Sequence, residues 1–236
     1  YYIIEVTKSQ YLKENFMQDL SYEKISESIF VCKSKNHRFG TDAVLLTEFS
    51  NYKSSDLVCD FGTGCGIIPL AMCIKNPPKK IYAVDIQEDA ILQVRLGIEK
   101  SQIDRIVPVC ADLKSFDCQD VGKFSLVTCN PPYFTINSGF KSALDSQIIA
   151  RHEVLCNIDD VCKSASRLLK FGGRLCMCNR PDRLSDVITA MKSNNIEPKT
   201  LQLVSKNADT PPWLFLIEGK KGAKPSLKIL PNRFMY

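Results

Sequence analysis

The sequence predicts an α/β protein with a doubly wound, mostly parallel sheet, and three observations lead to this prediction. From residue 57 onward, short apolar runs alternate with helical periods, which is typical of βαβ units. A glycine-rich turn directly follows the first of these runs, at the place where open α/β sheets bind ligands. The last two apolar runs have no helix between them, which indicates an antiparallel hairpin appended to the sheet.

Periodicity and length place the elements in order. We expect a short strand or hairpin around 28–33 and a helix at 42–49. Parallel strands are expected at 57–59, 80–84, 106–109, 124–129 and 174–178. Helices are expected after the glycine turn, at 88–99, at 161–169 with Gly172-Gly173 as its end, and at 184–191. The final hairpin would use 200–204 and 213–217.

Length and composition favour one soluble domain. The chain has 236 residues, of which 44% are hydrophobic and 24% charged, an ordinary globular profile. No linker rich in Gly, Ser or Pro divides it. We therefore expect an N-terminal extension, 1–51, on a single domain, 52–236.

The cysteines indicate a reducing compartment. None of the 11 stands in a C-x-x-C pair, and several, such as Cys59 and Cys129, lie inside apolar runs. Free cysteine behaves there as a small buried hydrophobe, so we predict neither a metal site nor a disulfide. The chain also has no apolar run of about 18 residues and no secretory signal at its start. We expect a cytoplasmic protein without a membrane span.

The net charge of +5 is concentrated at the end of the chain. Residues 219–236 contain five basic residues and no acid, so the remainder has 26 of each sign. A basic tail on a neutral body suggests an acidic partner such as a phosphate backbone. The charge alone fits a solvated tail equally well.

The segment 60–66, Asp-Phe-Gly-Thr-Gly-Cys-Gly, predicts a nucleotide cofactor. Its glycines let the backbone approach a ligand closely, and Asp85, which ends the next strand, can accept hydrogen bonds from two ribose hydroxyls. Asp112 ends the third strand and is either an acceptor for the adenine amino group or a helix cap or surface acid. Because Asp60 would repel a pyrophosphate but suits an ammonium, S-adenosylmethionine is favoured over NAD.

The motif Asn130-Pro131-Pro132-Tyr133 follows the fourth strand and predicts the reaction. Two prolines stiffen the turn, so that the Asn130 side-chain oxygen and the Pro131 carbonyl can each accept one N–H of a planar amine. Tyr133 and Phe134 offer faces for stacking. This arrangement orients an amino nitrogen for methyl transfer, although the motif could also be a rigid exposed turn. The long loop 130–159 is expected to be a lid that faces the substrate.

Four blocks of sequence together resemble the bacterial tRNA1(Val) (adenine-37-N6) methyltransferase family over essentially the whole chain. They are His37-Arg38-Phe39-Gly40-Thr41-Asp42, Asn130-Pro131-Pro132-Tyr133-Phe134, Ala150-Arg151-His152-Glu153, and the tail from Ile217 to Pro231. The resemblance implies a Rossmann-like class I methyltransferase fold with seven strands. It also implies S-adenosylmethionine as cofactor and the adenine after the anticodon of a valine tRNA as target.

The resemblance also assigns roles. Asn130 to Tyr133 would hold the target base, and the N-terminal extension would close over the methionine end of the cofactor. Phe39 would line the same pocket or belong to the core. The expected cofactor-binding residues are Gly40, Thr41, Asp42, Asp60, Gly62, Thr63, Gly64, Asp85, Ile86, Asp112 and Asn130. The expected RNA contacts are His37, Arg38, Tyr133, Phe134, Arg151, His152, Lys220 and Lys221; the first two, and Arg151 and His152, could equally be surface polar residues.

Two other functions remain open at this stage. A protein glutamine N5-methyltransferase would use the same motif on a side-chain amide, but such enzymes usually carry an N-terminal helical domain for which about 50 residues leave little room. A non-catalytic RNA-binding or cofactor-binding module of the same fold would not need an intact Asn130. We expect RNA, most simply tRNA, as partner, and a monomer or weak dimer.

Overall fold

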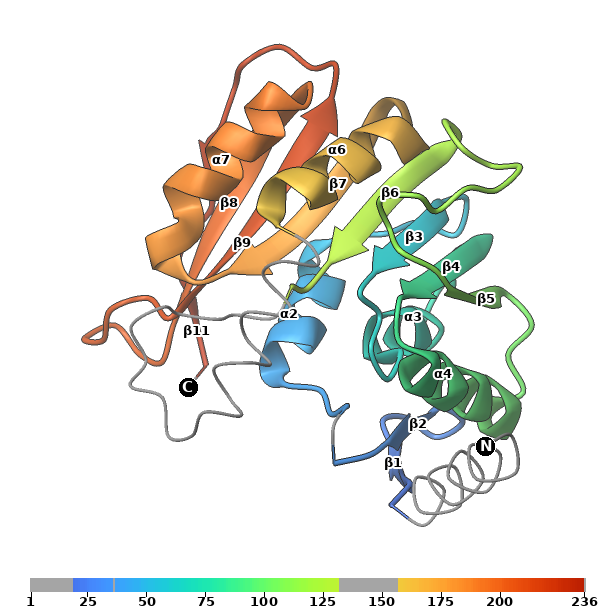
Figure 1. Ribbon diagram of the computed structural model, residues 1–236. Coiled ribbons are helices and arrows are strands. Elements are labelled where there is room, and N and C mark those ends of the chain that lie inside the picture. Colours follow the sequence, from blue (N-terminus) through green and yellow to red (C-terminus); the bar gives the residue numbers. More distant parts are fainter. Residues whose placement is uncertain (1–18, 36, 132–156, 236) are drawn as a thin grey trace, which may run out of the picture.

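A large sheet runs through the part of the chain that the computed structural model describes, residues 19–35, 37–131 and 157–235 (Figure 1). Its strand order is β10-β8-β9-β7-β6-β3-β4-β5, and β11 also pairs with β8. The strands are β3 (Leu57–Phe61), β4 (Lys80–Asp85), β5 (Ile106–Cys110), β6 (Phe124–Cys129), β7 (Leu169–Asn179), β8 (Ile196–Ser205), β9 (Leu214–Lys221), β10 (Lys228–Ile229) and β11 (Arg233–Phe234). The five strands from β3 to β7 pair with one another in parallel, which confirms the predicted doubly wound sheet.

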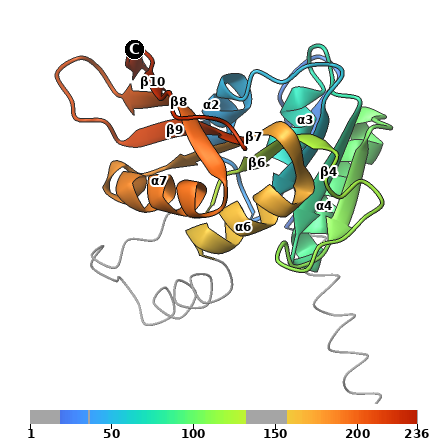
Figure 2. The same ribbon diagram turned by 90° about the horizontal axis from the view of Figure 1, so that it is seen from above.

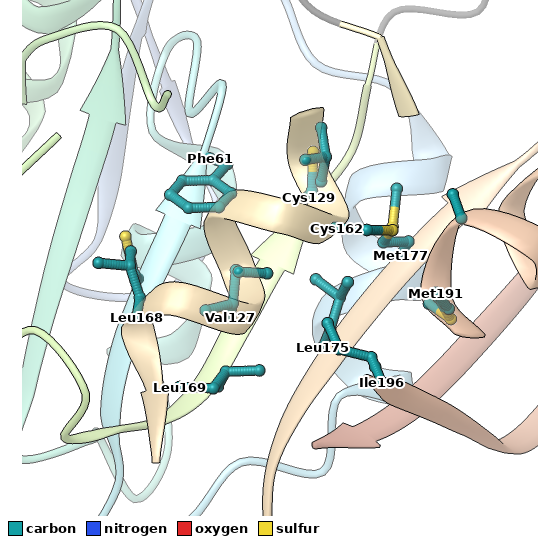
Figure 3. Close-up of a cluster of buried hydrophobic side chains, with 14 of the residues drawn as sticks. Phe61, Val127, Cys129, Cys162, Leu168, Leu169, Leu175, Met177, Met191 and Ile196 are labelled. Atoms are coloured by element: carbon teal, nitrogen blue, oxygen red, sulfur yellow. The ribbon is translucent and has the colours of Figure 1, made fainter. Parts of the chain in front are cut away.

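Helices cover both faces of this sheet (Figure 2). One face packs against α2 (Thr41–Phe49), α3 (Ile67–Met72) and α4 (Glu88–Ser101), the other against α6 (Ile158–Leu168) and α7 (Leu184–Ser193), and a 3-10 turn, η1 (Pro181–Arg183), precedes α7. Along β9, Leu214 and Leu216 point to the first face, Phe215 and Ile217 to the second. Such burial on both sides explains the near-continuous apolar runs. Figure 3 shows the cluster on the α6 and α7 face.

The two late strands form the predicted antiparallel hairpin, β8 with β9, next to the parallel strands of the sheet. β9 lies between β7 and β8 and is antiparallel to both, so Ile217 pairs with Met177 on one side and with Leu201 on the other. An interior strand buries both faces, and the first four residues of β9 are all buried. The sequence predicted the pairing of β9 with β8, but not the pairing of β9 with β7, which joins segments farther apart in the sequence.

The glycines after α6 do not end that helix, which differs from the sequence prediction. The helix stops at Leu168, and Leu169 already pairs with Phe124 of β6. Gly172 and Gly173 form an irregular stretch of β7, where Gly172 has a φ of +75°. A Cβ on Gly173 would lie 2.9 Å from the Phe124 carbonyl oxygen. These glycines therefore allow a bulge beside β6.

The basic tail is part of the sheet. β10 and β11 pair in parallel with the outer edge of β8, and the Leu230 amide donates to the Leu201 carbonyl at 2.8 Å. Arg233 forms an ion pair with Glu48 of α2 at 2.6 Å. The tail thus covers a sheet edge that would otherwise expose unpaired backbone groups.

The predicted N-terminal hairpin is confirmed as β1 (Ser21–Lys24) and β2 (Phe30–Lys33). It packs on α4 through residues spaced four apart. Ser101 Oγ accepts from the Phe30 amide at 2.9 Å, and Gln93 Nε2 donates to the Cys32 carbonyl at 3.0 Å. Between them, a Cβ on Gly97 would stand 3.2 Å from the Phe30 carbonyl oxygen. One polar and small stripe of α4 therefore holds β2.

Arg174 of β7 anchors the C-terminal end of α2. Its guanidinium donates to the Ser50 carbonyl and to Glu218, both at 2.8 Å, and lies 3.5 Å from Asp56. The side chain is only 19% exposed. Because the guanidinium satisfies two carboxylates and a helix end at once, we infer that it fixes α2 against the sheet.

We predict that Arg174→Ala lowers the free energy of unfolding by about 3 kcal/mol, because it leaves two poorly solvated carboxylates without their cation. Urea denaturation measures this change. Arg233→Ala serves as the control, since its ion pair with Glu48 is exposed and should contribute less than about 1 kcal/mol. Equal losses in the two variants would contradict the anchoring role.

Candidate functional site

The candidate site lies at the carboxyl ends of β3, β6 and β7, and strand register brings its residues together. Cys129 of β6 pairs with Phe61 of β3 and with Met177 of β7. The next residue along, Asn130, therefore stands between Gly62 and Cys178. This is the edge at which open parallel sheets bind ligands.

The glycine-rich loop after β3 has the backbone shape that its sequence requires. Gly62 and Gly64 have φ values of +63° and +55°, in the left-handed region that favours glycine. A Cβ on either would meet nothing within 4 Å. The Gly64 amide donates to Asp85 Oδ2 at 2.9 Å, and the Thr63 amide donates to the Val84 carbonyl at 3.1 Å. The loop is thus tied to the end of β4 and leaves open space beside both glycines.

Asp60 is a buried carboxylate with one satisfied oxygen. It is 1% exposed, and its Oδ1 accepts from the Thr128 hydroxyl at 2.6 Å. Its Oδ2 is buried with no hydrogen-bond partner among the described residues. Burial raises the pKa of the Asp60 carboxyl to about 7; the hydroxyls of Thr128 and Thr63 lower this pKa, and the nearby Asp85 charge raises it.

These residues fit S-adenosylmethionine. The buried Asp60 Oδ2 and the buried Thr63 hydroxyl beside it would accept from and orient the methionine ammonium. Asp85 already accepts from the Gly64 and Gln87 amides, and a carboxylate can accept further bonds, here from ribose hydroxyls. Ile86 is 48% exposed next to it and offers an apolar surface for an adenine ring.

Asp112 is at the same edge but is engaged in its own turn. Its Oδ1 accepts from the Lys114 amide at 2.9 Å, and its Oδ2 lies 3.6 Å from the Lys114 ammonium. Asp112 thus closes a turn at 112–116 rather than capping a helix, since the described residues between β5 and β6 form no helix. The side chain is still 33% exposed, so it can also accept from a ligand.

Asn130 is held from two sides by residues that are distant in sequence. Its Nδ2 donates to Asp42 Oδ2 at 3.2 Å, and its Oδ1 accepts from the Cys178 thiol at 3.1 Å. Asp42 belongs to the first turn of α2, whose N-cap is Gly40. The structure therefore brings the block 37–42 next to the motif that follows β6.

The residues just before α2 are fixed by α4. The Ser34 amide donates to the His37 carbonyl at 3.1 Å, and Gln93 donates to the same carbonyl at 3.3 Å. Arg38 is exposed, whereas Phe39 is partly buried against the core beneath α2. For Phe39 the core-packing alternative is thus realised.

Two expected RNA contacts are not brought to this edge. Lys221 donates to the carbonyls of Ser166 and Leu169 at the end of α6, at 2.5 and 2.7 Å. Lys220 pairs with Arg174 near the start of β7, at the amino ends of the parallel strands. The expected site residues Pro132, Tyr133, Phe134, Arg151 and His152 lie outside the described residues.

Sequence reasoning missed three residues that shape the site, namely Thr128, Cys178 and Gln93. Thr128 and Cys178 stand inside apolar runs, where they resemble ordinary strand residues. Strand periodicity could have identified them. Each lies an even number of residues along its strand from a position that faces α2, and such positions share one face of the sheet. Gln93 is fully buried in α4, next to the buried Ala90 and Val94, and a buried polar residue indicates a specific partner.

No group of three or more His, Cys, Asp or Glu side chains among the described residues could hold a metal ion. None of the described helices is long and apolar enough to span a membrane.

Comparison with known proteins agrees with this geometry. Residues 52–223 match the model of the family described as "Methyltransferase domain". Two curated relatives are named tRNA1(Val) (adenine(37)-N6)-methyltransferase. The protein from Parabacteroides distasonis is 29% identical over 77% of this chain and 76% of its own length, and that from Phocaeicola vulgatus is 36% identical over 56% and 55%.

Solved structures share the fold. A predicted O-methyltransferase from Agrobacterium tumefaciens superposes with a TM-score of 0.64 at 18% identity, covering 83% of this chain and 88% of that one. A SAM dependent methyltransferase from Aquifex aeolicus superposes with a TM-score of 0.55 at 14% identity, covering 76% and 89%. Residues 52–223 match the methyltransferase domain family, and the glycine-rich loop at 60–66 fits the cofactor. The chain therefore belongs to the S-adenosylmethionine-dependent methyltransferase domain family.

Proposed function

We propose that this methyltransferase modifies the exocyclic N6 amino group of an adenine in RNA, specifically the adenine next to the anticodon of a tRNA. The names of the relatives support this substrate. The observation that carries the proposal is the position of Asn130, which stands one residue beyond the pairing of β6 with β3, beside Gly62 of the cofactor loop. An amide acceptor there can hold an amino group at the mouth of the cofactor site.

In this proposal the chain binds both reactants by hydrogen bonds to fixed acceptors. S-adenosylmethionine supplies an electrophilic methyl group. Asp60 holds the ammonium of its methionine part and Asp85 its ribose, while Gly40, Thr41 and the extension 1–51 close that side of the site. Asn130 Oδ1 and the Pro131 carbonyl accept the two amino hydrogens of the adenine, so that the nitrogen lone pair faces the cofactor. These acceptors bind more strongly as the nitrogen becomes positive.

The RNA must present an unstacked base to reach such a site. A base in a loop leaves its stack at lower cost than one in a duplex, which favours an anticodon loop. Exposed Arg38 and neighbouring His37 are suited to contact phosphate from the block that leads to Asp42. We also propose Tyr133, Phe134, Arg151 and His152 as contacts with the base and its flanking nucleotides.

Labelled S-adenosylmethionine tests the proposal directly. Incubation with total tRNA, followed by nucleoside mass spectrometry and mapping of the modified position, should give N6-methyladenosine at one position next to an anticodon. Label in a protein substrate instead would favour a glutamine methyltransferase. Cofactor binding without transfer to either substrate would favour a binding module.

We predict that Asn130→Ala lowers the rate of methyl transfer at least about a hundredfold, because the acceptor that orients the amine is lost. Cofactor affinity, measured by calorimetry, should change little. Asn194→Ala is the control, since Asn194 forms an exposed hydrogen bond with Asp159 and neither residue is among the proposed site residues. A parallel loss of cofactor affinity would contradict the proposed role.

We predict that Asp85→Ala weakens cofactor binding about a hundredfold, because both the ribose acceptor and the acceptor of the Gly64 and Gln87 amides disappear. Isothermal titration with S-adenosylmethionine gives the dissociation constant. Asp209→Ala removes an exposed acid of the β8–β9 loop and should leave it unchanged. Unaltered affinity in Asp85→Ala would mean that other residues bind the ribose.

We predict that cofactor affinity rises with pH up to about 7 and then levels off. The pKa of the Asp60 carboxyl is raised from 3.8 to about 7, so below that pH the ammonium must displace a proton from it. The dissociation constant should fall up to about tenfold per pH unit between about pH 5.5 and 7. Without cofactor, the same shift makes the fold less stable as pH rises from 3.8 toward 7, because the folded state retains the proton longer.

Asp60→Asn is the matched variant for this pH dependence. It keeps the shape of the side chain but has no proton to release, so its weaker cofactor binding should be flat across the same pH range. Calorimetry in buffers of different ionisation enthalpy should detect proton release with the parent protein and none with the variant. A parent protein whose affinity does not depend on pH would exclude Asp60 as the ammonium acceptor.

A further inference from the structure

We propose that Cys178 and Asp42 are positioning residues that fix which end of the Asn130 amide faces the acceptor amine. This inference depends on the role that the proposed function gives to Asn130. Neither the glycine loop nor the diproline motif includes Cys178, which lies on the third strand of the site, β7. The two residues approach Asn130 from a helix and a strand, respectively.

The chemistry of the two neighbours allows one amide orientation. A carboxylate accepts hydrogen bonds and cannot donate them, so Asp42 Oδ2, 3.2 Å away, requires the Nδ2 end of Asn130. A thiol can donate, and the Cys178 Sγ lies 3.1 Å from Asn130 Oδ1. The opposite orientation would bring the amide oxygen against the carboxylate and lose both hydrogen bonds. Asp42 and Cys178 therefore select the same rotamer.

The selected orientation is the one that methyl transfer to an amine needs. It directs Oδ1, the acceptor, to the side of β7, and a carbonyl oxygen has two lone pairs, so the thiol bond is compatible with a second bond from the target amine. Donation from Nδ2 to a carboxylate also increases the negative charge on Oδ1, since hydrogen bonds in a chain polarise one another. A stronger acceptor stabilises the positive charge that develops on the nitrogen.

Gly40, the N-cap of α2, leaves space for the Asp42 carboxylate. A Cβ on Gly40 would lie 2.6 Å from Asp42 Oδ1, so the carboxylate occupies the space that any other side chain at position 40 would need. Its place in the first turn of α2 also suits a negative charge. Glycine at the N-cap thus makes room for the acid that orients Asn130.

Cys178 has a matched control two residues earlier on the same strand. Cys176 and Cys178 are both fully buried and both face α2, but the Cys176 thiol contacts Glu218 rather than Asn130. Replacing either thiol with alanine removes the same atoms from the same layer of the core. A purely structural role predicts similar effects for the two substitutions, whereas a positioning role predicts different rates of transfer.

The experiment compares Cys178→Ala, Cys178→Ser and Cys176→Ala by single-turnover methyl transfer at saturating cofactor, with the cofactor dissociation constant as second readout. We expect Cys178→Ala to lose about tenfold in rate, the equivalent of one hydrogen bond of orientation, with unchanged cofactor affinity. Cys178→Ser should restore the rate to within about threefold, because a hydroxyl also donates. Cys176→Ala should retain the parent rate.

Two results would overturn the inference: a parent-like rate in Cys178→Ala, or equal losses in Cys178→Ala and Cys176→Ala. Asp42→Ala and Gly40→Ala extend the test to the other side of the amide and should each slow transfer at least about tenfold. Failure of the proposed function is a separate outcome, because the parent protein itself would then methylate no adenine in RNA. If the parent methylates a protein amide instead, the same variants compared on that acceptor still decide the role of Cys178.

Discussion

The parallel hydrogen-bonded register of β3, β6 and β7 is the constraint on which the site depends. Asp60 pairs with Thr128, and Thr128 pairs with Cys176, so these positions share one face of the sheet, as does Cys178 two residues later. A slip of one residue in β6 would turn its polar side chains toward α6 and α7. The apolar side chains that alternate with them prevent such a slip, because they must fill the core on the other face (Figure 3).

The same packing that sets the register also makes the site unfavourable for an uncompensated charge. Asp60 lies at the end of a strand that is buried on both faces, where a carboxylate with one unpartnered oxygen is unfavourable. The fold satisfies Oδ1 with Thr128 and leaves Oδ2 for a ligand. A site that is unfavourable for a bare carboxylate favours a cationic partner, so the apolar core around Asp60 would contribute to ammonium binding in the role proposed for this residue.

The sequence predicted local features well and distant pairings poorly. Strands β3 to β6, helices α2 and α4, and the glycine loop follow from short-range patterns, and the structure has them within a few residues of the expected bounds. The insertion of β9 between β7 and β8, and the pairing of the tail with β8, depend on which edges meet in space. Likewise, Asp42 was recognisable from its block, whereas its contact with Asn130 spans 88 residues of sequence.

Helix α2 explains how these distant contacts become one site. Arg174 holds its C-terminal end against β7 and β9, and the first turn at its other end presents Asp42 to Asn130. A short helix is rigid, so an anchor at one end determines where the other end lies. The ion pairs of Arg174 lie at the amino ends of the parallel strands and the Asn130 amide at their carboxyl ends. They are therefore mechanically coupled through α2. We infer that a residue such as Arg174, outside the cofactor loop and the diproline motif, contributes to the precision with which Asn130 is oriented.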